Sequence, residues 1–168
     1  IRGFALKATL AFAVVGIIKT VGHGLAEIVS KTLFTQQLGW SFVEVSVIAG
    51  YAVVPEFIGA VSGGFLADRF GRRRLMTIGL IIYGTFTILF GTFSSLWTES
   101  WFSTLYLLFY AGLFAIVTVS YLSLSMRISW TRSTATMFTT YMTLSNVGHV
   151  VGNWMAGPVR GMFSFEAT

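Results

Sequence analysis

Five long apolar segments, separated by short polar stretches, occupy most of this chain. They run over roughly residues 8–30, 43–67, 75–93, 104–124 and 133–159. An α-helix needs about 20 mainly apolar residues to cross the hydrocarbon core of a bilayer, and each segment is about that long. A membrane β-barrel would instead need segments of about ten residues with alternating polarity, and the sequence lacks that alternation. The sequence therefore predicts an all-α membrane protein with five transmembrane helices.

Charged residues are too scarce for a protein surrounded by water. Asp, Glu, Lys and Arg make up 10% of the 168 residues, whereas soluble domains carry about 25%. The net charge of +5 comes largely from basic residues between the apolar segments, which favours anionic lipid over nucleic acid as a partner. The absence of cysteine excludes disulfides and thiolate metal sites. No repeat or linker composition divides the chain, so we expect one domain over residues 1–168.

The distribution of basic residues predicts the orientation in the membrane. If all five segments span the bilayer, most of the Lys and Arg side chains fall on one side: Arg2, Lys7, Arg69, Arg72, Arg73, Arg74, Arg127 and Arg132. Only Lys31 and Arg160 fall on the other side. Cytoplasmic connections are enriched in Lys and Arg. We therefore expect residues 64–74 to be cytoplasmic, in an inner or plasma membrane.

The densest run of charge is the stretch GFLADRFGRRR, residues 64–74, between the second and third apolar segments. Just before it, Gly59 and Gly63 have the spacing that lets a neighbouring helix approach closely. Asp68 falls where the second helix should end. Its carboxylate would pair with the N-terminus of a neighbouring helix, or with the arginines beside it. Gly71 permits a tight turn.

This stretch resembles the loop signature of the major facilitator superfamily, Gly-x-Leu-Ala-Asp-Arg-x-Gly-Arg-Arg. The matching positions are Gly64, Asp68, Arg69, Gly71, Arg72 and Arg73. The resemblance implies a secondary active transporter, without a cofactor, whose two six-helix halves alternate access to a central site. In that family the loop joins the second and third helices of a half, and its Asp contributes to closing the cytoplasmic gate. The chain would then supply five helices of one half-bundle, with the last helix missing.

Two further resemblances favour the C-terminal half, helices seven to eleven. Residues 131–146 resemble the eleventh helix of the branch that contains muropeptide permeases and acetyl-CoA transporters, and residues 18–23 resemble its seventh helix. The first residue, Ile1, is not Met, so we expect an internal piece of a longer protein whose other half is missing. The resemblance implies a small polar solute, such as a muropeptide, that is carried together with protons.

The ionisable residues within the first two apolar segments include Lys19, His23, Glu27 and Glu56. Lys19, His23 and Glu27 are four residues apart, so they share one face of the first helix. Glu56 falls near mid-depth in the second segment, which makes Lys19 and Glu56 the expected ion pair. A charge at the bilayer centre costs a few kcal/mol or more, so these groups should face a cavity or a partner. We interpret the four as a proton-coupling set; the alternative is a permanent ion pair that fixes helix packing.

Uncharged polar residues form a second set in the fifth segment. Asn146, His149 and Asn153 have spacings of three and four, so they lie on one helix face that suits a cavity for a sugar or peptide substrate. The alternative is hydrogen bonding between helices, which is typically worth about 0.6 kcal/mol in membranes. Tyr106 and Tyr110 are either cavity-lining or packing residues.

Enzyme motifs are absent from the sequence, so we predict no catalysis and no cofactor. The two His lie in different segments, and we predict no metal site from them. Two other classes stay open, a membrane-embedded enzyme and a channel-like helical bundle. Within transport, a proton-coupled exporter of drugs or metabolites is the alternative to an importer.

Overall fold

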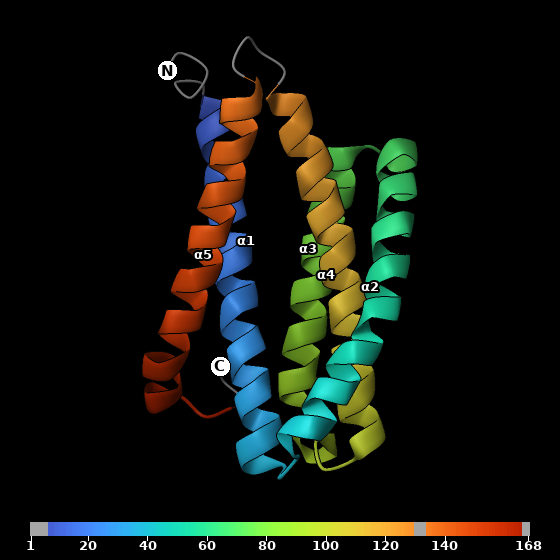
Figure 1. The fold of residues 1–168 in the computed structure, drawn as a ribbon, viewed down its shortest axis with the longest axis vertical. Helices are drawn as coiled ribbons and strands as arrows, with labels where there is room; N and C mark the ends of the chain where they lie inside the picture. Colours follow the sequence, from blue (N-terminus) through green and yellow to red (C-terminus); the bar gives the residue numbers. More distant parts are fainter. Residues whose placement is uncertain (1–6, 130–133, 166–168) are drawn as a thin grey trace. The chain divides into compact units, whose positions relative to one another are not determined.

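The computed structural model describes residues 7–129 and 134–165, and every regular element in these ranges is helical. In chain order (Figure 1) the elements are α1 (Lys7–Thr32), the π-helical turn η2 (Leu33–Gln37), α2 (Phe42–Phe70), α3 (Arg72–Thr92), the 3-10 turn η3 (Ser94–Leu96), α4 (Ser100–Ile128) and α5 (Thr134–Met162). The predicted all-α fold is confirmed. Arg2 and Arg132, both expected on the cytoplasmic side, lie outside the described residues.

Four of the helices are long and apolar enough to cross a membrane. They are α1 continued by η2, over Thr9–Gln37, and α2, α3 and α4. Within the described ranges α5 does not join this group, because its threonine, asparagine and histidine side chains lower its mean hydropathy. The four apolar helices support a multi-pass membrane protein. A fifth span over residues 133–159 stays a prediction.

Helix α2 runs further than the sequence predicts. It continues through Asp68 and Arg69 to Phe70, and α3 begins at Arg72. The expected loop over residues 64–74 is therefore mostly helical, and a single residue separates the two helices. Hydropathy alone ends the predicted helix before the polar Asp68 and Arg69, although Arg69 has good helix propensity.

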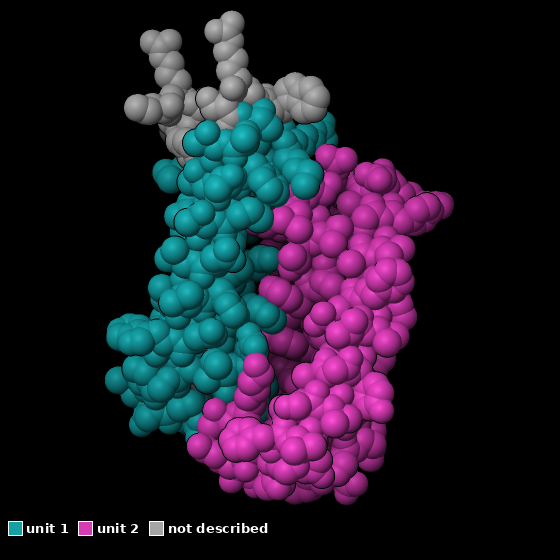
Figure 2. Space-filling view, viewed as in Figure 1, with its two compact units in different colours: residues 1–30, 124–163 teal, residues 31–123, 164–168 magenta. Residues whose placement is uncertain are grey.

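The chain folds into two compact units (Figure 2). Unit 1 contains Ile1–Ser30 and Leu124–Phe163, and so holds most of α1, the end of α4 and all of α5. Unit 2 contains Lys31–Ser123 and Ser164–Thr168, and so holds η2, α2, α3 and most of α4. Two of the three boundaries between the units fall inside α1 and α4, and the third follows the end of α5, so composition carries no sign of this division. The expected single domain stays a prediction.

In unit 1, glycines bring α1 and α5 into close contact, and Figure 1 shows the two helices side by side. A Cβ atom on Gly148 would meet the carbonyl oxygen of Ile17 and the hydroxyl of Thr20, and one on Gly152 would meet the carbonyl oxygen of Val21. Backbones that approach this closely leave no room for larger residues, as is common between membrane helices. The small residues of α5 therefore determine which side of α5 faces α1.

In unit 2, glycines likewise bring α2 and α4 into close contact. A Cβ atom on Gly59 would meet the carbonyl oxygen of Gly112, and one on Gly63 would meet the backbone of Ile116. Gly112 in turn lies against the carbonyl and ring of Pro55. The close approach expected from the spacing of Gly59 and Gly63 is thus observed.

Aromatic stacking joins α3 to α4 in unit 2. The rings of Phe90 and Tyr106 stack with centroids 3.6 Å apart, and those of Tyr83 and Tyr110 lie 5.0 Å apart. The indole Nε1 of Trp97 donates to the carbonyl oxygen of Phe90 at 2.8 Å. Both Tyr106 and Tyr110 are buried. Of the two interpretations of these tyrosines, the structure supports the packing role.

Candidate functional site

The signature stretch forms a tight helical hairpin. The amide of Gly71 donates to the carbonyl of Ala67 at 3.1 Å, and its own carbonyl accepts from the amide of Leu75 at 3.0 Å. Gly71 thus ends α2 and starts α3 with a φ of 89°. This backbone conformation is strained for residues with a Cβ atom, so glycine is the residue that suits this turn.

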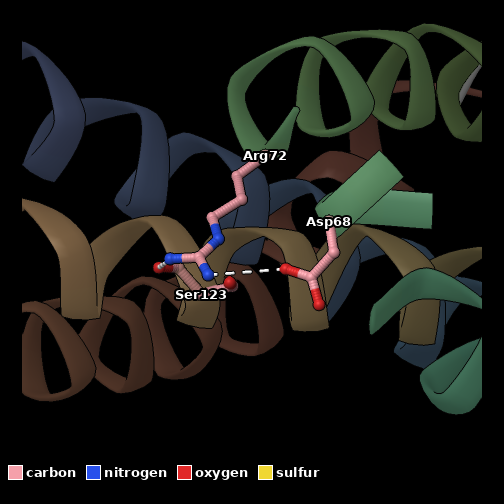
Figure 3. A network of polar contacts seen from close by, with 3 residues as sticks. All are labelled: Asp68, Arg72 and Ser123. Atoms are coloured by element: carbon pink, nitrogen blue, oxygen red, sulfur yellow. Dashed lines mark hydrogen bonds and ion pairs between the residues drawn. The ribbon is translucent and has the colours of Figure 1, made fainter. Parts of the chain in front are cut away.

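Arg72 links the hairpin to α4, as Figure 3 shows. One guanidinium nitrogen, Nη2, lies 3.5 Å from Oδ1 of Asp68, and the other, Nη1, donates to the carbonyl oxygen of Ser123 at 3.3 Å. Ser123 belongs to α4 and lies in unit 2 with the hairpin. The Asp68 side chain remains 75% exposed and that of Arg72 34% exposed. Of the two partners expected for Asp68, the structure thus shows an arginine beside it.

The remaining arginines of the hairpin point to an anionic environment. Arg73 and Arg74 are exposed in the first turn of α3. The N-terminus of a helix carries about half a positive charge, so cations there oppose the helix dipole. The Arg69 guanidinium lies 5.8 Å from the ring centre of Phe70. Helix stability therefore does not explain this charge, and anionic lipid as its partner stays a prediction.

A second polar site lies between α1 and α5 in unit 1. The ring nitrogen Nε2 of His149 lies 3.0 Å from Oε2 of Glu27, at hydrogen-bond distance, with the carboxylate as acceptor. The ring of His23 stacks on that of His149, with centroids 5.6 Å apart and planes inclined by 24°. One ligand atom from each of the three residues lies within 4.8 Å of the other two. The side chains therefore form one cluster, which we call the His–Glu cluster.

The backbone around the His–Glu cluster is tightly packed. A Cβ atom on Gly24 would meet the carbonyl oxygen and ring of His149 and the Oδ1 atom of Asn153. That Oδ1 atom is buried and has no hydrogen-bond partner among the described residues. One turn earlier on α1 than His23, Lys19 is buried, with 8% of its surface exposed. The cluster thus lies where α1 and α5 pack closely together.

The comparison with protein families decides which class of protein this is. The family model described as Major Facilitator Superfamily matches residues 6–167. The chain belongs to the major facilitator superfamily. Neither the curated proteins nor the solved structures contain a match to it. The superfamily consists of secondary transporters that sit in lipid bilayers and carry small-molecule substrates, and the four apolar helices of this chain fit that setting.

The site residues of this transporter are only partly grouped as the sequence predicts. His23 and Glu27 do share one face of α1, but His149, assigned to the substrate cavity, joins them. Glu56 is exposed on α2, in the other unit from Lys19, so their ion pair stays a prediction. Asn146 is exposed on α5. The position of His149 between Gly148 and Gly152 indicates that it lies near a close helix contact, but the sequence does not identify its partners on α1.

A further surface on α5, which carries four threonines, was missed. A pocket of about 450 Å³ is lined by Ala135, Thr136, Thr139, Thr140, Thr143 and Leu144. The hydroxyl of Thr140 donates to the carbonyl of Thr136 at 2.8 Å, which leaves its oxygen able to accept. The threonine spacing of three and four places these hydroxyls on one helix face. This spacing is visible in the sequence and would have identified the surface.

Proposed function

We propose that this chain is part of a proton-coupled carrier that moves a small polar solute, such as a muropeptide, by alternating access. In this proposal the chain supplies helices seven to eleven, and the other half of the carrier completes the pathway. The observation that carries the proposal is the state of Asp68: it lies at the end of α2, largely exposed, and held by one long contact to Arg72. The weakly held Asp68 carboxylate could therefore exchange Arg72 for another partner during the transport cycle.

The energetics of the Asp68 contact suit a gate. An exposed ion pair contributes about 0–1 kcal/mol, and the 3.5 Å separation places this pair at the weak end. The Asp68 carboxylate could therefore leave Arg72 for a helix N-terminus in the other half of the carrier at a small cost in free energy. Arg72 would keep its contact with Ser123 and hold the hairpin against α4 during that exchange.

Glu56 is the proposed coupling carboxylate. It lies on an apolar helix, directly after Pro55, and its side chain is exposed among the described residues. An ionisable group at membrane depth normally faces a partner or a water-filled cavity. Lys19 supplies the buried cation that we propose as its partner in one state of the cycle. Loss of the Glu56 proton would then be linked to formation of that pair.

The proposed substrate surface is on α5. The threonine pocket and the exposed amide of Asn146 offer several neutral hydrogen-bonding groups on one helix. Neutral donors and acceptors suit the hydroxyl and amide groups of a sugar-peptide. A pocket built for an apolar drug would instead be lined mostly by aliphatic and aromatic side chains. The four threonine hydroxyls of the pocket support the polar solute of this proposal.

The test uses the full-length protein in proteoliposomes with an imposed pH gradient and a radiolabelled muropeptide. We expect Glu56→Gln to abolish accumulation against the substrate gradient while counterflow exchange continues, because only the coupling step is lost. Glu99→Gln removes an exposed carboxylate outside the long helices and should behave as the parent. Accumulation by Glu56→Gln equal to the parent would overturn the coupling role. Absence of muropeptide counterflow in the parent would overturn the substrate class.

A further inference from the structure

We propose that the His–Glu cluster, formed by His23, Glu27 and His149, binds a divalent transition-metal ion of the zinc class. Two imidazole nitrogens and one carboxylate oxygen are a donor set that zinc and its neighbours in the first transition row favour. Magnesium and calcium prefer an all-oxygen environment, so the imidazoles select against them. The site therefore takes a metal that the sequence analysis did not anticipate.

The distances in the cluster lie close to those that coordination needs. Donor atoms bound tetrahedrally to one zinc ion, at about 2.0–2.1 Å each, are roughly 3.3 Å apart. Nε2 of His149 and Oε2 of Glu27 are 3.0 Å apart, and all three ligand atoms lie within 4.8 Å of one another. Bringing all three ligand atoms to roughly 3.3 Å from one another thus requires side-chain rotamer changes and no movement of the helices.

The arrangement of the rings supports the same conclusion. Two imidazoles on one tetrahedral ion have ring centres roughly 5 Å apart. Those of His23 and His149 are 5.6 Å apart. The two rings come from different helices, and the contact of Gly24 with the backbone of His149 holds those helices together at this level. The cluster is therefore preorganised by packing that does not depend on the metal.

A bound ion would have room for another ligand. Three protein ligands leave a fourth position for water or for a small anionic ligand, as in zinc sites that remain open. The buried Oδ1 atom of Asn153, one turn after His149, is a nearby oxygen that such a water could bond. Coordination would also cross-link α1 to α5, which are otherwise joined by glycine contacts and ring packing.

The test is a titration of the purified full-length protein with Co²⁺, followed by visible absorption. Co²⁺ in a four- or five-coordinate site with nitrogen ligands absorbs far more strongly than hexa-aqua Co²⁺, so the signal reports the site directly. We expect one equivalent of Co²⁺ to give these bands and an excess of Zn²⁺ to abolish them. The readout does not involve transport, so it is independent of the proposed coupling through Glu56.

The variants separate coordination from folding. His23→Gln removes one ligand and the ring contact with His149 but leaves the hydrogen bond between Glu27 and His149 intact, so it should stay folded and elute as the parent does. We expect it to weaken Co²⁺ binding by more than about tenfold, because even loss of an outer-shell partner costs 10–100-fold in other sites. The control, Glu99→Gln, should bind Co²⁺ as the parent does. A parent without the bands, or a His23→Gln variant with unchanged affinity, would overturn the site.

Discussion

The imidazole of His149 on α5 reaches the carboxylate of Glu27 on α1 at 3.0 Å, although the two residues are 122 positions apart in the chain. This contact joins a residue expected in the proton-coupling set to one expected in the substrate cavity. Both side chains are about one-third exposed, 31% for Glu27 and 37% for His149, so the pair is accessible as well as packed. The two predicted polar sets of α1 and α5 are therefore linked by the hydrogen bond between Glu27 and His149.

A double-mutant cycle measures this coupling. Glu27→Gln and His149→Gln should each lower the thermal stability of the full-length protein in detergent, since each weakens the same contact. The double variant should lose less than the sum of the two. The expected interaction energy is about 0.6 kcal/mol, the average for hydrogen bonds between membrane helices. Additive losses would show that the two residues do not interact in the folded protein.

The glycine contacts between α1 and α5 predict a position-dependent effect of a methyl group. Gly152→Ala places a Cβ against the carbonyl of Val21, so it should lower the free energy of unfolding by about 1–3 kcal/mol. Gly157→Ala on the same helix meets nothing within 4 Å and should be neutral or slightly stabilising. Thermal unfolding of the two variants makes the comparison. Equal effects would contradict the described packing.

Because Arg72 contacts both Asp68 and Ser123, we predict that a positive charge alone at position 72 does not sustain the parental transport rate. Arg72→Lys keeps the charge, but a single ammonium cannot reach Asp68 and the Ser123 carbonyl as the two guanidinium nitrogens do. We expect the counterflow rate to fall severalfold. Arg74→Lys, which changes an exposed side chain two residues on, should retain the parental rate. Equal rates for both variants would show that the link to α4 has no part in transport.

The charge of Lys19 should act on the proposed metal site. Lys19 precedes His23 by four residues, about 6 Å along the helix axis, so its positive charge opposes a bound cation. Lys19→Met should tighten Co²⁺ binding about three- to tenfold, whereas Lys19→Arg, which keeps the charge, should not. The Co²⁺ titration described above measures both. Unchanged affinity in the Met variant would contradict an electrostatic contact between Lys19 and the cluster.

Hydropathy predicts the fold but not the ends of its helices. The apolar segments identify the helices because a backbone in lipid must satisfy its own hydrogen bonds. The end of α2 is missed because Asp68 and Arg69 are polar and yet helical. Likewise, the polar composition of α5 keeps it outside the group of strongly apolar helices, although it packs closely on α1.

The candidate site is harder to predict, because helical spacing fixes only which residues share a face of one helix. That rule correctly grouped His23 with Glu27. It could not bring His149 to them, since this depends on which side of α5 meets α1, and at what height. The glycines at 148 and 152 decide both, and their partners on α1 appear only in the structure.

The central claim is that Glu56 lines a watery path through the membrane, and accessibility to a water-soluble reagent tests it most directly. These 168 residues contain no cysteine, so Glu56→Cys and Ile58→Cys, introduced singly, each place one thiol in them. Both positions are exposed among the described residues, but they lie about 200° apart around α2. We predict that a charged, membrane-impermeant thiol reagent labels Glu56→Cys in intact membranes and leaves Ile58→Cys unmodified. Labelling of Ile58→Cys alone, or of neither, would contradict the account.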